Sequence, residues 1–373
     1  MTRRRRRRRR SRRTSTTVGG LVVMFIMVVG VYLFQRVAES GLVDLTPAPV
    51  SETVSGGAGW YQLYFTPVEA QDAKADRLDD VLASAILNAG RSVDLAAYDI
   101  GLQPIADALV MAAARGTRVR VVTETDNMDR DTVQQLLAAG ISVVDDQSYG
   151  LMHHKFVVID GATVFTGSWN LTFSGTERNN NNALRIDATR LAENYTAEFE
   201  EMFTRRLFGA QSVADTPNPH LRINDVDVEN YFSPDDGVAQ QILQELRAAQ
   251  QSIYFMAFSF TREDFSQVLK EKAAAGVAVR GVYETQQIAS GSDQSWNLLS
   301  AAGLDVLQDG NRYKLHHKVF IVDGATVITG SYNFSRSAEE RNDENVLIIH
   351  DPDLAFRYLQ EFASRWLEAG GAQ

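Results

Sequence analysis

Two stretches of this sequence repeat the same polar residues at the same spacing. Residues 153–170 read HHKFVVIDGATVFTGSWN and residues 316–333 read HHKVFIVDGATVITGSYN, and every difference between them exchanges one apolar or aromatic residue for another. Each stretch supplies an imidazole, an ammonium group, an amide and a hydroxyl. Two imidazoles can cleave a phosphodiester together, because one attacks phosphorus while the other protonates the leaving oxygen. The remaining donors would hold the non-bridging oxygens, so the pattern predicts phosphodiester chemistry that needs no metal ion.

The apolar, β-branched run in each stretch predicts a strand, in which residues two apart share a face. His153 and Lys155 therefore project to one side and His154 to the other. The Asp-Gly-Ala sequence predicts a hairpin turn that returns the Gly-Ser-x-Asn segment to the start of the strand. The candidate catalytic residues are His153, Lys155, Asp160, His316, Lys318 and Asp323. The candidate phosphate-binding residues are Lys155, Ser168, Asn170, Lys318, Ser331 and Asn333.

Several of these residues have a structural alternative. Asp160 and Asp323 each open a hairpin at Asp-Gly, where turn and scaffold residues are common. Ser168 and Ser331 can form turns or support the site from behind. The second histidine of each motif faces away from the predicted cleft and is expected to be structural. A metal cluster of all four motif histidines is a further alternative, which strand alternation opposes because it splits each pair across two faces.

The repetition extends over most of the chain. YFTP at 64–67 matches YFSP at 231–234, and RSVDLAAYDI at 91–100 matches QSIYFMAFSF at 251–260. Each half alternates apolar strand patterns with Ala- and Leu-rich helix patterns and ends in an amphipathic helix. This order predicts layered α/β architecture in each half, and duplicated halves are expected to fold alike and to pack face to face.

The composition indicates a globular protein of two domains, with 373 residues of which 45% are hydrophobic and 23% charged. The absence of cysteine excludes disulfides, thiolate metal sites and thiol catalysis. The predicted organisation is an Arg-rich tail at 1–17, an apolar segment at 18–36, a flexible stalk at 37–59, a first half at 60–209, a linker at 210–220 and a second half at 221–373.

The N-terminal segment combines a block of arginines with an uncharged run from Val18 to Phe34. As a helix this run would be about 26 Å long, close to the roughly 30 Å of a hydrocarbon core. The pattern favours a signal anchor: the arginines stay in the cytoplasm and the catalytic part lies beyond the cell membrane as a single-pass protein. A signal peptide cleaved near AES at 38–40, which would yield a secreted protein, is the alternative.

Beyond this segment the chain is acidic, with 26 basic and 47 acidic residues in 37–373 and a formal charge of −21. Such a surface repels a polyanion unless basic groups gather in one cleft. Membrane attachment and this charge favour a phospholipid substrate, with nucleic acid as the alternative. A basic groove for nucleic acid would use Arg178, Arg185, Arg336 and Arg341. Aromatic residues that would line a lipid entrance, or else pack in the core, are Trp169, Phe173, Tyr332 and Phe334.

The spacing His-x-Lys, four residues, Asp, six residues, Gly-Ser-x-Asn occurs in both stretches and resembles the signature of the phospholipase D superfamily. The segment from Gly330 to Trp366 is similar to the small members, the bacterial endonuclease and mitochondrial cardiolipin hydrolase branch, in which two chains with one motif each form a dimer. The resemblance implies two similar α/β/α sandwich halves with a shared central active-site cleft and a monomeric active unit. It also implies a phosphoric diester hydrolase that works through a phosphohistidine without a cofactor.

Eleven residues past each motif the two copies differ, because residues 179–182 read NNNN and residues 342–345 read NDEN. Asn181 thus stands opposite Glu344, at a place where the family has a polar side chain that supports the motif histidine. A carboxylate beside an imidazole favours the protonated ring more than an amide does. We therefore predict that His153, backed by Asn181, is the neutral nucleophile and that His316, backed by Glu344, is the general acid. The alternative is that Asn181 lies in a surface loop that tolerates replacement.

Overall fold

The computed structural model describes residues 59–67, 77–147, 149–291 and 293–372, and all of them belong to one structural unit. The predicted Arg-rich tail and membrane anchor, and the predicted stalk except its last residue, lie outside the described residues. Within the described ranges, no helix is both long enough and apolar enough to cross a bilayer.

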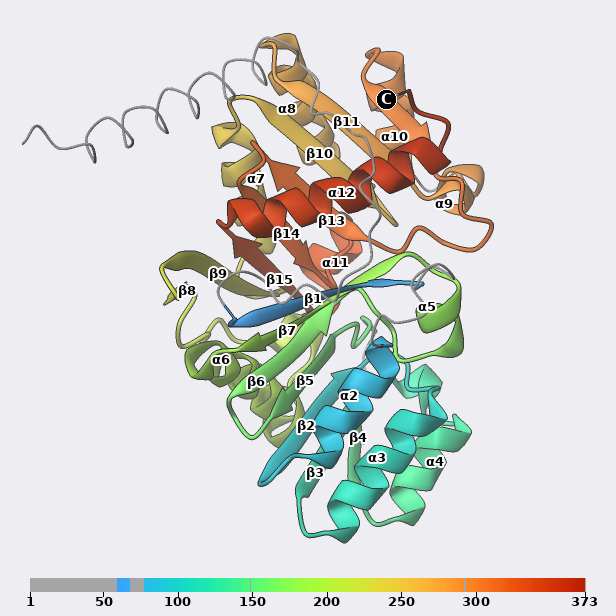
Figure 1. Ribbon diagram of the computed structural model, residues 1–373, viewed down its shortest axis with the longest axis vertical. Helices are drawn as coiled ribbons and strands as arrows, with labels where there is room; N and C mark the ends of the chain where they lie inside the picture. The colour runs from blue at the N-terminus through green and yellow to red at the C-terminus, as the bar shows by residue number, and fades with distance from the viewer. Residues whose placement is uncertain (1–58, 68–76, 148, 292, 373) are drawn as a thin grey trace, which may run out of the picture. The chain divides into compact units, whose positions relative to one another are not determined.

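The first half forms a seven-stranded mixed sheet with helices on both faces (Figure 1). Its elements in chain order are β1 (Tyr61–Thr66), α2 (Leu78–Leu87), β2 (Ser92–Ala97), α3 (Gln103–Ala114), β3 (Arg118–Thr123), the 3₁₀ helix η2 (Thr125–Asn127), α4 (Asp131–Ala138), β4 (Ser142–Asp145), β5 (Lys155–Ile159), β6 (Thr163–Gly167), α5 (Phe173–Glu177), β7 (Asn181–Asp187), α6 (Thr189–Glu200), the π-helix η3 (Glu201–Arg205) and the 3₁₀ helix η4 (Gly209–Gln211). The strand order is β1-β7-β6-β5-β2-β3-β4. The strands β2, β3 and β4 are parallel because helices connect them, whereas β5, β6 and β7 are joined as an antiparallel meander.

The second half repeats this arrangement in an eight-stranded sheet of order β12-β11-β10-β13-β14-β15-β9-β8. Its elements are β8 (His220–Ile223), β9 (Val226–Ser233), α7 (Val238–Ala248), β10 (Ser252–Ala257), α8 (Glu263–Ala274), β11 (Ala278–Tyr283), α9 (Thr285–Ala289), α10 (Gln294–Ala301), β12 (Asp305–Gln308), β13 (Lys318–Val322), β14 (Thr326–Gly330), α11 (Arg336–Glu340), β15 (Glu344–Ile349) and α12 (Pro352–Glu368). The helices α7, α8 and α10 share one apolar core with the sheet, and α12 crosses the opposite face (Figure 1).

Local sequence explains where the long helix α12 begins and which face it buries. The Asp351 side chain accepts the backbone N–H groups of Asp353 and Leu354, which would otherwise lack partners at a helix start. Leu354, Tyr358, Phe362 and Trp366 recur every four residues and are buried against the sheet. Each half is therefore an α/β/α sandwich, and the predicted duplicated fold is confirmed.

The two halves join where the motif strands begin. Backbone N–H of His153 donates to the carbonyl of Asp343 (3.0 Å), and backbone N–H of His316 donates to the carbonyl of Asn180 (2.9 Å). Each contact belongs to a short parallel bridge between one half and the other. The histidine of each motif is thus fixed to the opposite half by its own backbone.

Candidate active site

The two His-Lys pairs have the same local geometry. The Lys155 ammonium donates to the carbonyl of His153 at 2.6 Å, and the Lys318 ammonium donates to the carbonyl of His316 at 2.8 Å. All four side chains are buried. The imidazole and the ammonium of each motif contact the same aromatic ring, Tyr98 in the first half and Phe258 in the second, so they lie on one side of the chain as predicted.

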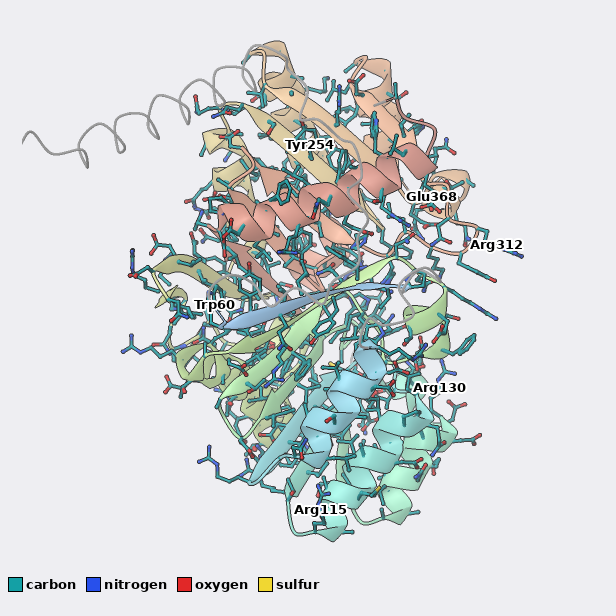
Figure 2. All side chains as sticks on the ribbon, viewed as in Figure 1. Trp60, Arg115, Arg130, Tyr254, Arg312 and Glu368 are labelled. Carbon is teal, nitrogen blue, oxygen red and sulfur yellow. The ribbon has the colours of Figure 1, made fainter. Side chains whose placement is uncertain are left out.

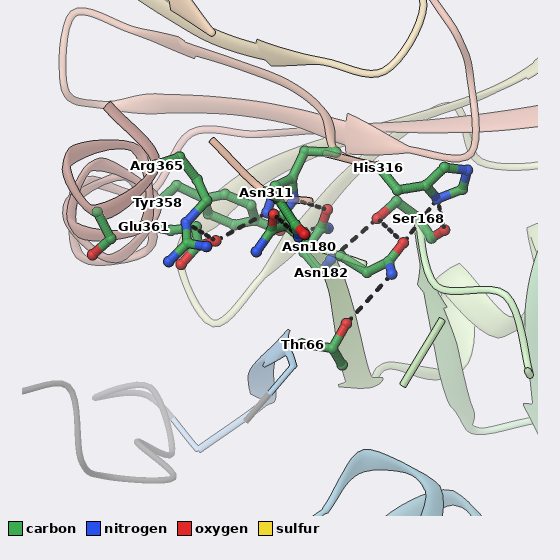
Figure 3. Close-up of polar contacts among 12 residues, drawn as sticks. Thr66, Ser168, Asn180, Asn182, Asn311, His316, Tyr358, Glu361 and Arg365 are labelled. Carbon is green, nitrogen blue, oxygen red and sulfur yellow. Dashed lines mark hydrogen bonds and ion pairs between the residues drawn. The ribbon is translucent and has the colours of Figure 1, made fainter. Parts of the chain in front are cut away.

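The pairs meet because each imidazole is held by the other half. Nδ1 of His316 lies 3.0 Å from the carbonyl oxygen of Ser168 and 2.8 Å from Oδ1 of Asn181. Figure 3 draws His316 next to Ser168 of the first half. Nδ1 of His153 lies 2.7 Å from Oε2 of Glu344. The oxygens beside His316 can only accept, which places its hydrogen on Nδ1, and the ionised carboxylate of Glu344 accepts from Nδ1 of His153 in the same way. Nε2 of each ring is then left for a substrate.

This crossed arrangement corrects our prediction of which residue supports which histidine. We expected Asn181 behind His153 and Glu344 behind His316, each within its own half. The structure shows the reverse, because the strands β7 and β15 bring their first residues to the opposite motif. The expectation of a surface loop is also wrong, since Asn181 is fully buried.

Burial and like charges determine the protonation of the site. Burial lowers the pKa of His153 and of His316 well below the ordinary value, and the ammonium groups of Lys155 and Lys318 lower both further. Burial also lowers the pKa of Lys155 to about 7 and that of Lys318 well below its usual range. Burial raises the pKa of Glu344 to about 7. These shifts favour neutral imidazoles, and the two lysines beside them suit a phosphodiester anion.

Asn170 and Asn333 occupy matching places after the Gly-Ser pairs. Both side chains are half-buried, and within the described part of the chain Oδ1 of each has no hydrogen-bond partner. An unpaired Oδ1 can accept a hydrogen bond but cannot contact a phosphate oxygen, so phosphate binding would have to use Nδ2 as the donor. Their role in binding phosphate stays a prediction.

Ser168 and Ser331 do not face the cleft as candidate phosphate contacts should. Oγ of Ser168 donates to Oδ1 of Asn181 (3.1 Å) and accepts the backbone N–H of Asn182 (3.1 Å). Oγ of Ser331 accepts the backbone N–H of Asn345 (3.0 Å). Both serines are completely buried. The structure thus favours the alternative in which they support the residues that hold the histidines.

The preceding glycines serve strand packing. A Cβ on Gly167 would lie 2.4 Å from the carbonyl oxygen of Asn182, and a Cβ on Gly330 would lie 2.1 Å from that of Asn345. Their φ angles of 140° and 152° are also unfavourable for other residues. The backbone that these glycines allow to approach is that of β7 and β15.

Asp160 and Asp323 lie at the far ends of β5 and β13, roughly 16 Å along the strand from the motif lysine. The Asp160 carboxylate accepts backbone N–H groups of Gly90, Arg91 and Ser92, and that of Asp323 accepts the three equivalent groups of residues 250–252. Both aspartates have positive φ, 54° and 52°, as hairpin residues. This placement contradicts a catalytic role and supports the scaffold alternative.

The second histidines form part of the buried interface between the halves. Nε2 of His154 lies 2.8 Å from Glu198 and its Nδ1 3.3 Å from the amide of Asn345. His317 lies in the same way between Glu361 (3.1 Å) and Asn182 (3.2 Å). They are structural, as predicted. Within the described ranges the four motif histidines form no group able to hold a metal ion.

Asparagine and tyrosine side chains complete this interface. Nδ2 of Asn182 donates to Tyr358 (2.9 Å; both residues are labelled in Figure 3) and to Thr329 (2.8 Å) of the second half. Asn345 Oδ1 accepts from Thr166 (2.8 Å) and Tyr195 (3.1 Å) of the first half. These fully satisfied buried amides specify how the halves align, because an unpaired amide would cost about 1–3 kcal/mol.

Sequence reasoning missed two aromatic rings that enclose the site. Tyr98 lies 5.1 Å from the ring of His153, and Phe258 lies 4.7 Å from the ring of His316. The ammonium groups of Lys155 and Lys318 are 5.3 and 4.8 Å from these same rings. Their matching positions in the repeat, at AAYDI and MAFSF, were the available signal.

Sequence reasoning also missed a pair of buried glutamates, Glu124 and Glu284, which are the fourth residues of the matching segments VVTET and GVYET. Glu124 accepts the backbone N–H of Met152 (2.9 Å), and Glu284 accepts that of Leu315 (2.6 Å). Each glutamate therefore fixes the backbone of the residue directly before a motif histidine.

The pKa values of this pair predict how stability depends on pH. Burial raises the pKa of both Glu124 and Glu284 to about 7. Between about pH 4.5 and 7 the two glutamates hold protons in the folded protein that they have lost in the unfolded chain. The contribution of Glu124 and Glu284 to the free energy of unfolding therefore falls as pH rises through this window. Because glutamine keeps the acceptor oxygen, we expect Glu124→Gln/Glu284→Gln to be more stable than the parent at pH 8, by about 1–3 kcal/mol.

Urea unfolding at pH 5 and pH 8 would measure the difference. Glu263→Gln, at an exposed position on α8, is the matched control and should leave the pH dependence unchanged. A double variant that is no more stable than the parent at pH 8 would contradict the prediction.

The predicted aromatic entrance is mostly core. Trp169, Tyr332 and Phe334 are buried, whereas Phe173 is 58% exposed. Of the four predicted groove arginines, Arg185 lies over Phe165 beside Asp187 and Arg336 pairs with Glu340. Arg178 and Arg341 remain at the junction of the halves, next to the residues that lead into the motifs.

Comparison with known proteins identifies the duplicated fold. Residues 82–203 and 242–366 each match the family described as cardiolipin synthase, PLD-like domain. The chain is 40% identical over 120 residues to the mitochondrial cardiolipin hydrolase of Xenopus tropicalis, a match that covers 32% of this chain and 57% of that protein. It is 33% identical over 157 residues to the phospholipase D of Rickettsia typhi, covering 41% of this chain and 76% of that one.

A solved structure shares the arrangement of both halves. The phosphatidylserine synthase of Haemophilus influenzae aligns over 81% of this chain and 86% of its own, with a TM-score of 0.61 at 13% identity, which shows the same fold. The matches to both halves confirm the predicted resemblance: the chain belongs to the phospholipase D superfamily, with two PLD-like domains in one polypeptide.

Proposed function

We propose that this protein is a phosphodiesterase that hydrolyses the head-group ester of phospholipids through a phosphohistidine. The observation that supports it best is the meeting of two buried His-Lys pairs, one from each half, with both Nε2 atoms free to act. The two lysines and the two motif asparagines would hold the non-bridging oxygens.

The reaction has two steps that use the same groups in opposite directions. In the first, Nε2 of His153 forms a bond to phosphorus, the bond from phosphorus to the leaving oxygen breaks, and His316 gives its Nε2 proton to that oxygen. In the second, His316 takes a proton from water, the water oxygen bonds to phosphorus, and the P–N bond breaks. His153 and the protonated His316 are then restored.

Under the sequence-based rule, the crossed contacts would make His153, beside Glu344, the general acid. We keep His153 as the nucleophile on a different ground, which is the charge that develops during attack. Attack through Nε2 leaves the His153 ring with its Nδ1 hydrogen and a positive charge, which the Glu344 carboxylate stabilises at 2.7 Å. Before attack, burial and two lysines keep the ring neutral and nucleophilic. The carboxylate therefore helps most when charge develops, as catalysis requires. His316 faces the neutral Asn181 amide, and the charge of a bound phosphate would raise its pKa enough to hold the proton.

The phospholipid substrate is supported by sequence and by relatives. The acidic composition beyond residue 36 disfavours a polyanion. The relatives that match parts of the chain are named cardiolipin hydrolase and phospholipase D. The chain spans only 57% of the cardiolipin hydrolase, so the activity of that whole protein is not transferred.

For localisation we keep the proposal of a membrane anchor at residues 18–36, with the catalytic part outside the cytoplasm. The Arg-rich block before it and the apolar run itself support this proposal. Such an anchor would place the catalytic part beside its lipid substrate.

A second candidate function, cleavage of single-stranded nucleic acid, is favoured by pairs of arginine and aromatic residues at the junction of the halves. Arg178 lies 5.0 Å from the ring of Phe173 and 5.1 Å from that of Tyr313, and Arg341 lies 5.5 Å from Tyr149, which is 90% exposed. Next to Tyr313, Arg312 projects outward (Figure 2). Exposed rings with nearby guanidinium groups can stack bases.

A direct comparison of substrates tests the proposal. The full-length chain in detergent would be assayed on phosphatidylcholine vesicles, cardiolipin vesicles and single-stranded DNA and RNA, with His153→Asn as the inactive control. We expect release of head group or phosphatidic acid from lipid, abolished in the control, and no cut strands. Cleavage of nucleic acid without lipid turnover, falling steeply with salt, would establish the second candidate instead.

A further inference from the structure

One imidazole and two carboxylates gather in the second half, at the opposite end of β15 from Glu344. Glu229 lies on β9, Glu245 on α7 and His350 directly after β15. One ligand atom from each lies within 4.8 Å of the other two, and all three side chains are partly exposed. No other group of three histidine or carboxylate side chains in the described ranges meets this condition. The distance along β15 to Glu344 is roughly 20 Å, so the cluster is separate from the catalytic site.

The geometry at the imidazole fits a metal ligand. Nε2 of His350 lies 3.3 Å from Oε1 of Glu229, close to the about 3.3 Å that separates two ligands of a tetrahedral ion bound at about 2.0 Å. Nδ1 of the same ring is 2.9 Å from Oγ1 of Thr326. A partner on the second ring nitrogen fixes the orientation of a ligating histidine, with Nδ1–H donating to the hydroxyl.

The charges of the cluster are incompletely balanced. Glu229 is paired with His350, and it also accepts from Tyr231 and lies 3.7 Å from His220. Glu245, in contrast, accepts no side-chain hydrogen bond from any described residue, although burial raises its pKa. Two neighbouring carboxylates and one imidazole form a site that a divalent cation would neutralise better than a single proton does.

The first half shows that the fold does not require this cluster. The residues at the three equivalent places are Gln62, Ala85 and Asp187. The hydroxyl of Tyr64 donates to Gln62 (2.6 Å) as that of Tyr231 donates to Glu229, and Thr163 donates to Asp187 (2.6 Å) where Thr326 meets His350. The supporting contacts are thus shared by both halves, while the ligand set occurs in the second.

We propose that Glu229, Glu245 and His350 bind one zinc ion, with a water molecule in the fourth position, where the partly exposed site meets solvent. One nitrogen and two oxygen ligands suit zinc, whereas calcium and magnesium prefer oxygen alone. The ion connects β9, α7 and the end of β15, and its role is structural. It is independent of the proposed phosphodiesterase reaction, in which our mechanism uses no metal.

Zinc binding to the metal-stripped full-length protein, titrated against a chromogenic zinc indicator, tests this site. The main variant, Glu245→Ala/His350→Asp, gives two of the three ligand positions the residues that the first half has there. We expect zinc affinity at least about 100-fold weaker than in the parent protein. We also expect saturating zinc to raise the melting temperature of the parent by about 4 °C or more and that of the variant by less than half as much.

Two further variants make the outcome decisive. His153→Asn/His316→Asn removes the catalytic imidazoles and should bind zinc as the parent does. Glu245→Gln keeps the size of a partly exposed side chain, so it should fold, and it should weaken binding about 10-fold or more. Unchanged affinity in Glu245→Gln, or loss of binding only when the catalytic histidines are replaced, would overturn the proposal. None of these measurements depends on catalytic activity.

Discussion

Replacing His316 with asparagine leaves a protein that releases one equivalent of p-nitrophenol from a p-nitrophenyl phosphodiester and then stops. This leaving group needs no proton, so the first step proceeds without the general acid. The second step still needs His316 to activate water, and the phosphohistidine therefore accumulates on His153. Replacing His153 with asparagine should abolish the burst as well, and both variants should lose about 10⁴-fold or more in turnover of a substrate with an alkoxide leaving group.

Rapid mixing with the chromogenic ester, followed by peptide mapping of the trapped protein, measures both expectations. His220→Asn, an exposed histidine outside the motifs, is the matched control and should keep normal turnover. A burst in His153→Asn with none in His316→Asn would reverse the roles. That result would mean that the carboxylate of Glu344 favours the protonated form of the His153 ring, as our sequence-based rule assumed.

Replacing Lys318 with methionine should lower activity and raise stability at the same time. Its ammonium is buried beside a second ammonium, that of Lys155, and this environment lowers the pKa of Lys318 well below its usual range. In the bound state the phosphate compensates this charge, and without the lysine we expect turnover to fall about 10³-fold. In the free protein Glu344 and Glu284 offset this charge only in part, so methionine should stabilise the fold by about 2 kcal/mol at pH 7.

The sign of the pH dependence provides a sharper measurement. The unfolded chain holds the Lys318 proton up to about pH 10, whereas the folded protein loses it earlier, so the stability of the parent rises with pH between these points. The methionine variant lacks this rise, and its advantage in urea unfolding should shrink as pH increases from 7 to 9. Lys272→Met, whose ammonium donates to the carbonyl of Ala249 outside the site, serves as control. A less stable Lys318→Met protein at pH 7 would contradict the prediction.

The motif chemistry and the duplicated α/β/α fold were predictable from the sequence. The alternation of side chains along a strand and the matching segments of the two halves can both be recognised without knowledge of the fold. Lys155 follows His153 by two residues in a strand, and that spacing alone places both on one side. The places of Asp160 and Ser168 were less certain, since a turn residue and a catalytic residue can have the same neighbours in sequence. Only the contacts with residues 90–92 and with Asn181 separate these alternatives.

The support of the histidines could not be predicted from either copy alone. Asn181 and Glu344 were identified as supporting residues, but the sequence contains no signal that each reaches the opposite motif. That depends on how two sheets meet, which is a property of long-range packing. Glu124 and Tyr98 were missed for a related reason. Their roles depend on contacts with Met152 and His153, which are distant in sequence and become neighbours only in the fold.

The crossed bonds of Asn181 and Glu344 give the active site a direction. In an assembly of two identical chains, both histidines would have the same neighbour, and a substrate could enter in either orientation with equal success. Joining the copies in one polypeptide let the neighbours differ, with a carboxylate beside His153 and an amide beside His316. An asymmetric diester would then bind in one orientation, with its leaving alcohol always next to His316. In such a protein, evolution can change the binding of one end of the substrate without changing the other. In an assembly of two identical chains, every substitution changes both ends.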